Sequence, residues 1–156
     1  MYWLLSSLMA EAVGLGASIV AFIQLSDRLI QTAKYCIEAI KDCPADIRAI
    51  LVEVSSLKAV LQTLDFLLAS DIAPGTCLLE QLAGEHGPVE GCRKSLSDLE
   101  RLLPRDFKTA SGKRRKILNT AEYLAWPLKQ TSARKLLDDI SRYKATITFA
   151  LTHDAS

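Results

Sequence analysis

Residues 44–70 read PADIRAILVEVSSLKAVLQTLDFLLAS, and this stretch decides the fold class. Its apolar residues recur at steps of three and four, which is the spacing of one face of an α-helix. Pro44 stands where a helix can open, because the first turn needs no amide hydrogen from it. The stretch therefore predicts an amphipathic helix over Pro44–Ser70 with these core residues: Ile47, Ile50, Leu51, Val54, Leu57, Val60, Leu61, Leu64 and Leu68.

The rest of the chain has the same helical character, and no segment shows the alternation of a strand. The predicted fold class is all-α, a helical bundle of four main helices plus one or two short helices. We expect an N-terminal extension over 1–8, a single helical domain over 9–153 and a tail over 154–156. The other predicted helices are Met9–Asp42 with a break near Ser26–Asp27, Cys77–Ala83, Pro88–Leu103, Gly112–Ala125 capped by Ser111, and Leu128–Thr152 after a kink at Pro127 packed by Trp126.

The N-terminal helix is almost empty of charge. Residues 12–26 carry none, but these 15 residues fall short of the ~20 that a membrane-spanning helix needs. Gly14 and Ser18 share one face, with Gly16 close by, and small residues at this spacing let helices approach closely. Two interpretations stay open: a core helix whose small residues mark a crossing with a neighbour, or a helix that leaves the bundle for a bilayer or an oligomer.

Charge is distributed unevenly along the chain. Residues 1–92 carry 5 Lys/Arg and 11 Asp/Glu, whereas residues 93–116 carry 9 and 3. Such a basic segment can bind anionic lipid head groups or phosphate backbones, or it can be a solvated loop and helix start. Only Phe107 could stack on bases, so we favour an acidic lipid or protein surface over nucleic acid. The basic candidates are Arg105, Lys108, Lys113, Arg114, Arg115 and Lys116.

Catalytic and metal chemistry lack a sequence basis. His86 falls in a Gly-flanked turn and His153 in the C-terminal tail, so no Ser/His/Asp arrangement is indicated. Gly112–Lys113 lacks the first glycine and the Ser/Thr of a phosphate loop. We therefore predict no enzyme, no metal and no cofactor. The four cysteines form no CxxC and fit reduced, buried thiols of a cytoplasmic protein: Cys36, Cys43, Cys77 and Cys92.

Several short motifs occur in the same order as in a known family. They resemble the N-terminal domain of fungal NACHT or other STAND-type NTPases and ankyrin proteins, the SesA and HeLo-like group. The resemblance covers about residues 9–153. The motifs are MAEAVGLGASIVAFIQLSDRLI (9–30), CPADIR (43–48), VEVSSLK (52–58), VEGCR (89–93), LAWPLK (124–129) and RKLL (134–137).

The resemblance implies a signalling or effector domain of a fungal NLR-like (STAND) protein, acting in regulated cell death or incompatibility. HeLo-type members target membranes when a partner releases the N-terminal helix, and Glu11 approximately matches an acidic residue that is functional there. The implied partners are NACHT/STAND or homotypic helical domains and anionic membrane lipids, with oligomerisation and plasma-membrane recruitment on activation. The alternative is a protein–protein adaptor without membrane activity. Residues 1–8 precede the family's usual start. These 156 residues contain no NACHT, ankyrin or prion-like segment, so we expect the activating part to be missing from this sequence or supplied by another chain.

Overall fold

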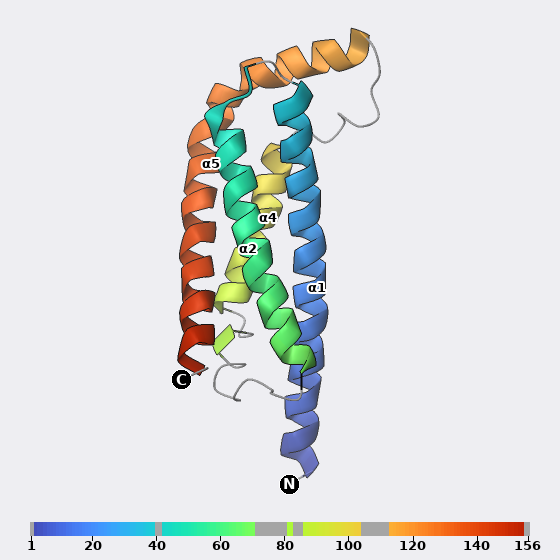
Figure 1. Ribbon diagram of the computed structural model, residues 1–156, viewed down its shortest axis with the longest axis vertical. Coiled ribbons are helices and arrows are strands. Elements are labelled where there is room, and N and C mark those ends of the chain that lie inside the picture. Colours follow the sequence, from blue (N-terminus) through green and yellow to red (C-terminus); the bar gives the residue numbers. More distant parts are fainter. Residues whose placement is uncertain (1, 40–41, 71–80, 83–85, 104–112, 155–156) are drawn as a thin grey trace.

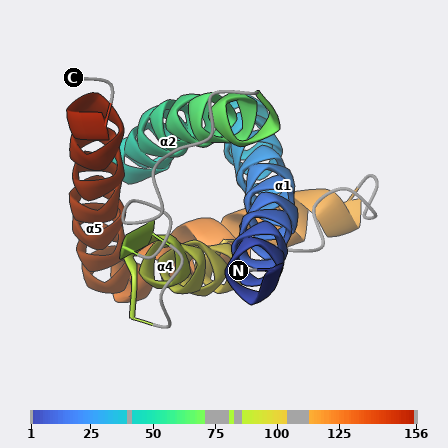
Figure 2. The same ribbon diagram turned by 90° about the horizontal axis from the view of Figure 1, so that it is seen from below.

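The computed structural model describes residues 2–39, 42–70, 81–82, 86–103 and 113–154 (Figure 1). These ranges contain four helices that run alternately up and down and form the predicted all-α bundle. Seen along its axis, the bundle has the helices at four corners in the ring order α1, α2, α5, α4 (Figure 2). Their bounds are α1 Tyr2–Ala39, α2 Ala45–Ala69, α4 Pro88–Leu102 and α5 Lys113–Asp154.

Two antiparallel pairs make up the bundle. Helix α1 packs mainly against α2, and α4 packs mainly against α5, whereas α1 and α4 touch much less. Burying apolar side chains of all four helices in one core removes their surface from water, which is the main force that holds such a fold together. The fully buried large side chains are Phe22, Ile19, Leu29, Ile50, Leu57, Leu61, Leu64, Leu82, Leu96, Leu99, Ile140 and Ile147.

Helices α2 and α4 match their predictions within a residue at each end. Helix α2 begins at Ala45, so Pro44 is its N-cap, and the amide of Ile47 donates to the carbonyl oxygen of Pro44 at 3.0 Å. Helix α4 opens with Pro88 as its first residue. A proline fits both places because neither position needs an amide hydrogen inside the helix.

Helix α1 differs from its prediction in two respects. It begins at Tyr2 rather than Met9, so residues 2–8 are the first turns of the same helix. It also runs without a break through Ser26 and Asp27. Ser26 is fully buried, and Asp27 forms an ion pair with Lys58 of α2 at 2.5 Å. The charge that looked like a helix end, Asp27, is therefore paired by the neighbouring helix, while Ser26 packs into the core.

Helix α5 joins the two predicted C-terminal helices into one. It changes direction sharply, so that its first turns lie across one end of the bundle (Figure 1). Pro127 lies inside the helix, where it removes one backbone hydrogen bond and crowds the preceding turn. Trp126, the residue before Pro127, is 5% exposed, so its indole is packed against the protein at the bend, as predicted. Residues 77–80, Ala83 and Ser111 lie outside the described residues; Gln81 and Leu82 are helical.

Candidate functional site

The first turns of α1 extend past the ends of the other helices (Figure 1). Gly14, Ala17 and Ser18 are exposed. Among the side chains that the structure describes in this helix, Ile19 is the first that is buried. Residues 2–26 contain a single charged residue, Glu11. An almost uncharged helical segment therefore projects from the bundle, and we call residues 2–18 the projecting segment.

Among the described residues, no neighbouring helix packs against the small residues Gly14 and Gly16 of this segment. A Cβ atom added to Gly14 or Gly16 would meet no described atom within 4 Å. The described part of the chain therefore offers no neighbour for a close crossing at Gly14 or Gly16. Gly14 and Ser18 share one face of the helix, and both are exposed. Glu11 lies on the backbone of the projecting segment, and its side chain is outside the described residues.

The four basic candidates that the structure describes, Lys113–Lys116, lie at the other end of the molecule (Figure 1). Arg105 and Lys108 are outside the described residues. The run from Lys113 through Arg114 and Arg115 to Lys116 forms the first turn of α5, on the arm that crosses the end of the bundle opposite to the projecting segment (Figures 1 and 2). The structure therefore separates the two sets of candidate residues by the length of the bundle.

One carboxylate fixes the bend of α5. Asp46, in the first turn of α2, accepts hydrogen bonds from Trp126 Nε1 at 3.4 Å, Gln130 Nε2 at 2.7 Å and Arg134 Nε at 3.0 Å. Burial favours the neutral acid, but these donors outweigh it and lower the pKa of Asp46 below its ordinary value of 3.8. The side chain of Asp46 is only 12% exposed, whereas that of Arg134 is 63% exposed, so the carboxylate is covered and the cluster meets water on the side of Arg134.

Sequence reasoning did not find the Asp46 cluster. A usable signal was present, because Trp126, Gln130 and Arg134 are spaced by four and therefore share one face of a helix. An acid in the first turn of α2 also suits the positive end of the helix dipole. Asp46 is 80 to 88 residues away from these donors in the sequence. Neither signal predicts which carboxylate the donors bind.

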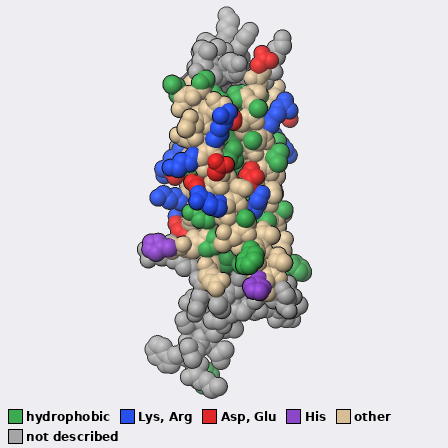
Figure 3. Space-filling view, turned by 90° about the vertical axis from the view of Figure 1, so that its left-hand side faces the viewer, with side chains coloured by type: hydrophobic (Ala, Val, Ile, Leu, Met, Phe, Trp, Pro, Cys, Tyr) green, Lys and Arg blue, Asp and Glu red, His purple; other side chains and the backbone are tan. Residues whose placement is uncertain are grey.

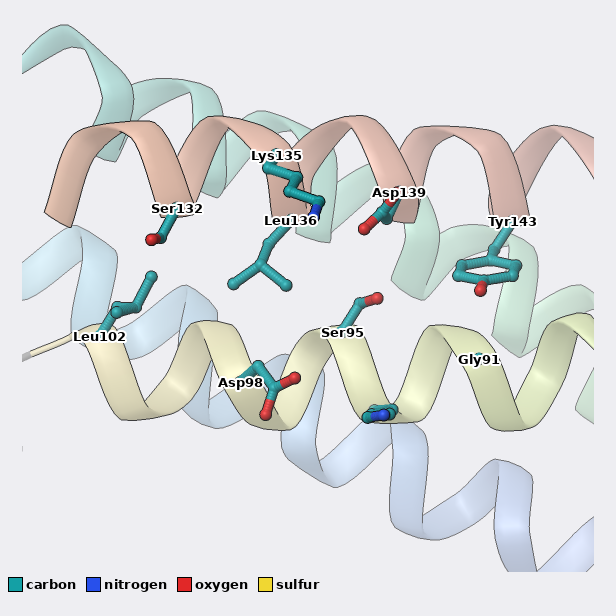
Figure 4. Close-up of a pocket in the computed structure, with 10 residues that line it drawn as sticks. Gly91, Ser95, Asp98, Leu102, Ser132, Lys135, Leu136, Asp139 and Tyr143 are labelled. Atoms are coloured by element: carbon teal, nitrogen blue, oxygen red, sulfur yellow. The ribbon is translucent and has the colours of Figure 1, made fainter.

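A cleft of about 490 Å³ lies between α4 and α5 (Figure 4). At one end Tyr143 lies against Gly91, where an added Cβ would be 2.6 Å from Tyr143 Cε1 and closer still to Cζ. Gly91 is therefore the residue that lets this ring lie against α4. Ser95 and Asp139 point toward one another across the cleft in Figure 4.

The charges around this cleft are largely balanced on their own helices. Asp98 forms an ion pair with Arg101 at 3.2 Å, and Asp139 forms one with Arg142. Figure 3 shows Lys, Arg, Asp and Glu side chains interspersed on the side of the bundle where α5 lies. Mixed charges of this kind are typical of a solvated surface, and the cleft lining contains neither His nor Cys.

None of the described thiols is in a disulfide, and two of them are buried. Cys36 and Cys92 are buried, and Cys43 is half-buried. Burial, with a smaller contribution from the negative charge of Glu53, raises the pKa of Cys92 to about 12, so this thiol is protonated at neutral pH. Across the described ranges, no three His, Cys, Asp or Glu side chains gather to hold a metal ion.

In the part of the chain that the structure describes, no helix combines the length and the apolar character of a membrane span. The fold and its candidate residues define an all-helical bundle domain with a projecting first helix and a bent last helix. The chain belongs to the family described as pigment biosynthesis cluster protein PigL N-terminal, whose family model matches residues 10–155. No curated protein and no solved structure matches the chain.

Proposed function

We propose that this domain is the N-terminal signalling or effector module of a fungal NLR-like (STAND) protein, and that it has no enzymatic activity. After activation, its projecting segment targets a membrane, as in regulated cell death or incompatibility. The family match to an N-terminal domain supports a module of a larger system. The SesA and HeLo-like resemblance of the 9–30 and 43–58 motifs supports the signalling role.

The projecting segment is the observation that carries the proposal. It has one charged residue, and its exposed positions at Gly14, Ala17 and Ser18 are small. When a partner or the interfacial region of a bilayer covers a helix with so little charge, apolar surface is removed from water and the free energy falls. Activation in this scheme clusters several copies, so that their projecting segments act together.

Dye release from vesicles tests the membrane step. The 156-residue chain, clustered through a C-terminal trimerising tag, is added to vesicles of phosphatidylcholine and phosphatidylserine that contain a quenched dye. We expect release by the wild-type chain. Ala17→Glu places a charge on the projecting segment and should weaken release at least 10-fold, since a charge in the apolar layer of a bilayer costs about 2.5–3.5 kcal/mol.

Gln24→Glu is the matched control, because Gln24 is an exposed residue of the same helix beyond the projecting segment. It should release dye as the wild type does. Absence of release by the clustered wild type, or equal release by Ala17→Glu, would contradict the membrane step. The alternative function, a protein–protein adaptor, is favoured if vesicles stay intact while Ala17→Glu abolishes capture of a helical partner domain.

A further inference from the structure

The cleft between α4 and α5 is lined by one stripe of residues from each helix (Figure 4). Because the two helices are antiparallel, Ser95 faces Asp139 in the middle of the cleft. Leu102 faces Ser132 at the end away from Tyr143. Serine thus stands at two positions where a tightly packed helix pair carries larger apolar side chains. The space left between the helices, about 490 Å³, is in the range of small-molecule sites, and we call it the α4–α5 cleft.

Ser95 contributes a buried hydroxyl to the α4–α5 cleft. The residue is only 7% exposed, and its Oγ forms no hydrogen bond with any residue that the structure describes. Figure 4 shows this hydroxyl pointing across the cleft toward α5. A buried hydroxyl without a partner destabilises the fold, whereas an alanine would fit the same space at no such cost. The missing hydrogen bond therefore has to come from water or from a ligand in the cleft.

The acidic residues of the α4–α5 cleft already have cationic partners. Asp98 forms its ion pair with Arg101 at 3.2 Å, and Asp139 forms its ion pair with Arg142. Each pair joins residues three apart on one helix, so the two pairs add no net charge to the cleft. A cationic ligand would have to compete with an arginine for either carboxylate.

Two lysines of the α4–α5 cleft have no such partner. Lys94 of α4 and Lys135 of α5 line it, and neither forms an ion pair or a hydrogen bond with the described part of the chain. Figure 4 shows the Lys135 side chain extending along α5 toward Asp139. Two lysines, two arginines and two aspartates give the cleft a net charge of +2. Its unpaired ammonium groups and the Ser95 hydroxyl can all donate hydrogen bonds, so they favour an anionic ligand.

A phosphate monoester matches these donors better than a carboxylate does. A phosphate group on an organic molecule carries about two negative charges at neutral pH and three acceptor oxygens. Lysine binds phosphate as a point charge on a flexible stem, so ammonium groups from two facing helices can converge on one phosphate. The cleft has room for more than a phosphate group, and Leu102 and Leu136 add apolar surface for an organic part.

We propose that the α4–α5 cleft binds a small organic phosphate monoester. The phosphate contacts Lys94, Lys135 and the hydroxyl of Ser95, and the organic part lies against Leu102 and Leu136. A soluble metabolite and the head group of phosphatidic acid both present this chemistry. The inference is independent of the membrane step, because it uses neither the projecting segment nor the basic turn of α5.

Titrations of the 156-residue chain, followed by ¹H–¹⁵N NMR in a buffer without phosphate, measure this binding. The probes are glycerol 3-phosphate and soluble dihexanoyl phosphatidic acid, each up to about 10 mM, which covers weak small-molecule sites. We expect saturable shifts of the Ser95 and Lys135 amide signals, and none with glycerol as the neutral control. Binding of glycerol 3-phosphate alone assigns the site to a soluble ligand, and binding of phosphatidic acid alone assigns it to a lipid head group.

Substitutions of the charged residues test the sign of the ligand charge. Lys94→Met and Lys135→Met should each weaken binding about 10-fold, because each removes a hydrogen bond from a charged donor. Lys34→Met, at an exposed lysine of α1 outside the cleft, is the matched control and should bind as the wild type does. Asp139→Asn removes a negative charge that faces the ligand and should strengthen binding, whereas it would weaken binding of a cation or a zwitterion.

Ser95→Ala separates the ligand contact from a role in folding. It should weaken binding, while the stability of the chain without ligand stays equal or rises, because the hydroxyl has no protein partner to lose. A chain whose signals shift with neither phosphate compound, or shift equally with glycerol, refutes the site. Unchanged binding after Lys94→Met and Lys135→Met, or weaker binding after Asp139→Asn, would refute it as well. Circular dichroism checks that every variant stays helical.

Discussion

Replacing Gly91 by alanine tests how closely α4 and α5 approach. Non-bonded carbon atoms rest about 3.5–4.0 Å apart, so an added Cβ forces the ring of Tyr143 to retreat by about 1 Å. Overpacking of this kind costs about 1–3 kcal/mol, while alanine gains about 1 kcal/mol over glycine inside a helix. We therefore expect Gly91→Ala to lower the free energy of unfolding by about 1 kcal/mol.

The sign of this effect depends on Tyr143. In a Tyr143→Ala background the obstruction is gone, so Gly91→Ala should raise the free energy of unfolding by about 1 kcal/mol through helix propensity alone. Urea denaturation followed by circular dichroism at 222 nm measures both effects, and the double-mutant cycle gives a coupling of about 2 kcal/mol. Equal stabilisation by Gly91→Ala in both backgrounds would refute the contact. Gly14→Ala, where a Cβ has open space, should not destabilise.

Three further predictions concern the buried polar groups. Asp46→Asn should lower the free energy of unfolding by about 1–2 kcal/mol at neutral pH. Folding lowers the pKa of Asp46, so the carboxylate stabilises the fold fully above pH 3.8 and less as the pH falls further. In acid denaturation, the difference in stability between wild type and Asp46→Asn should therefore shrink below that pH. Cys92, buried and with a pKa of about 12, should react with iodoacetamide at pH 8 only as fast as the chain unfolds, as mass spectrometry can show. Lys144→Met removes the ion-pair partner of the half-buried Glu53 and should lower the free energy of unfolding, measured with urea, by about 2 kcal/mol. Adding Glu53→Gln to this variant should restore part of the lost stability.

The helices whose periodicity is regular could be predicted from sequence. In α2 and α4, apolar residues recur at steps of three and four, and a proline stands at the start of this pattern. The proline and the apolar spacing therefore predict the same helix bounds. The break predicted at Ser26–Asp27 was wrong because local polarity was its only basis. A contact with Lys58, 31 residues further along the chain, offsets that polarity.

The candidate site was predicted only in outline. The small residues at Gly14 and Ser18 were correctly placed on one helix, but composition does not tell whether a neighbour covers them. Contacts between distant segments decided the rest. Asp46 pairs with Arg134 between α2 and α5, and Tyr143 lies against Gly91 between α5 and α4. In both cases the two residues are far apart in the sequence, so the local pattern around one of them does not identify the other.

The opposite positions of the projecting segment and the basic turn of α5 have an electrostatic consequence. Helix α2, which spans the bundle between them, has 25 residues and is therefore about 37 Å long. In a physiological salt solution the field of a charged surface decays over about 8 Å. A bilayer that holds the projecting segment, with the bundle upright, thus exerts almost no attraction on Lys113–Lys116. That turn then faces away from the lipid and stays free to meet an anionic surface of a different molecule.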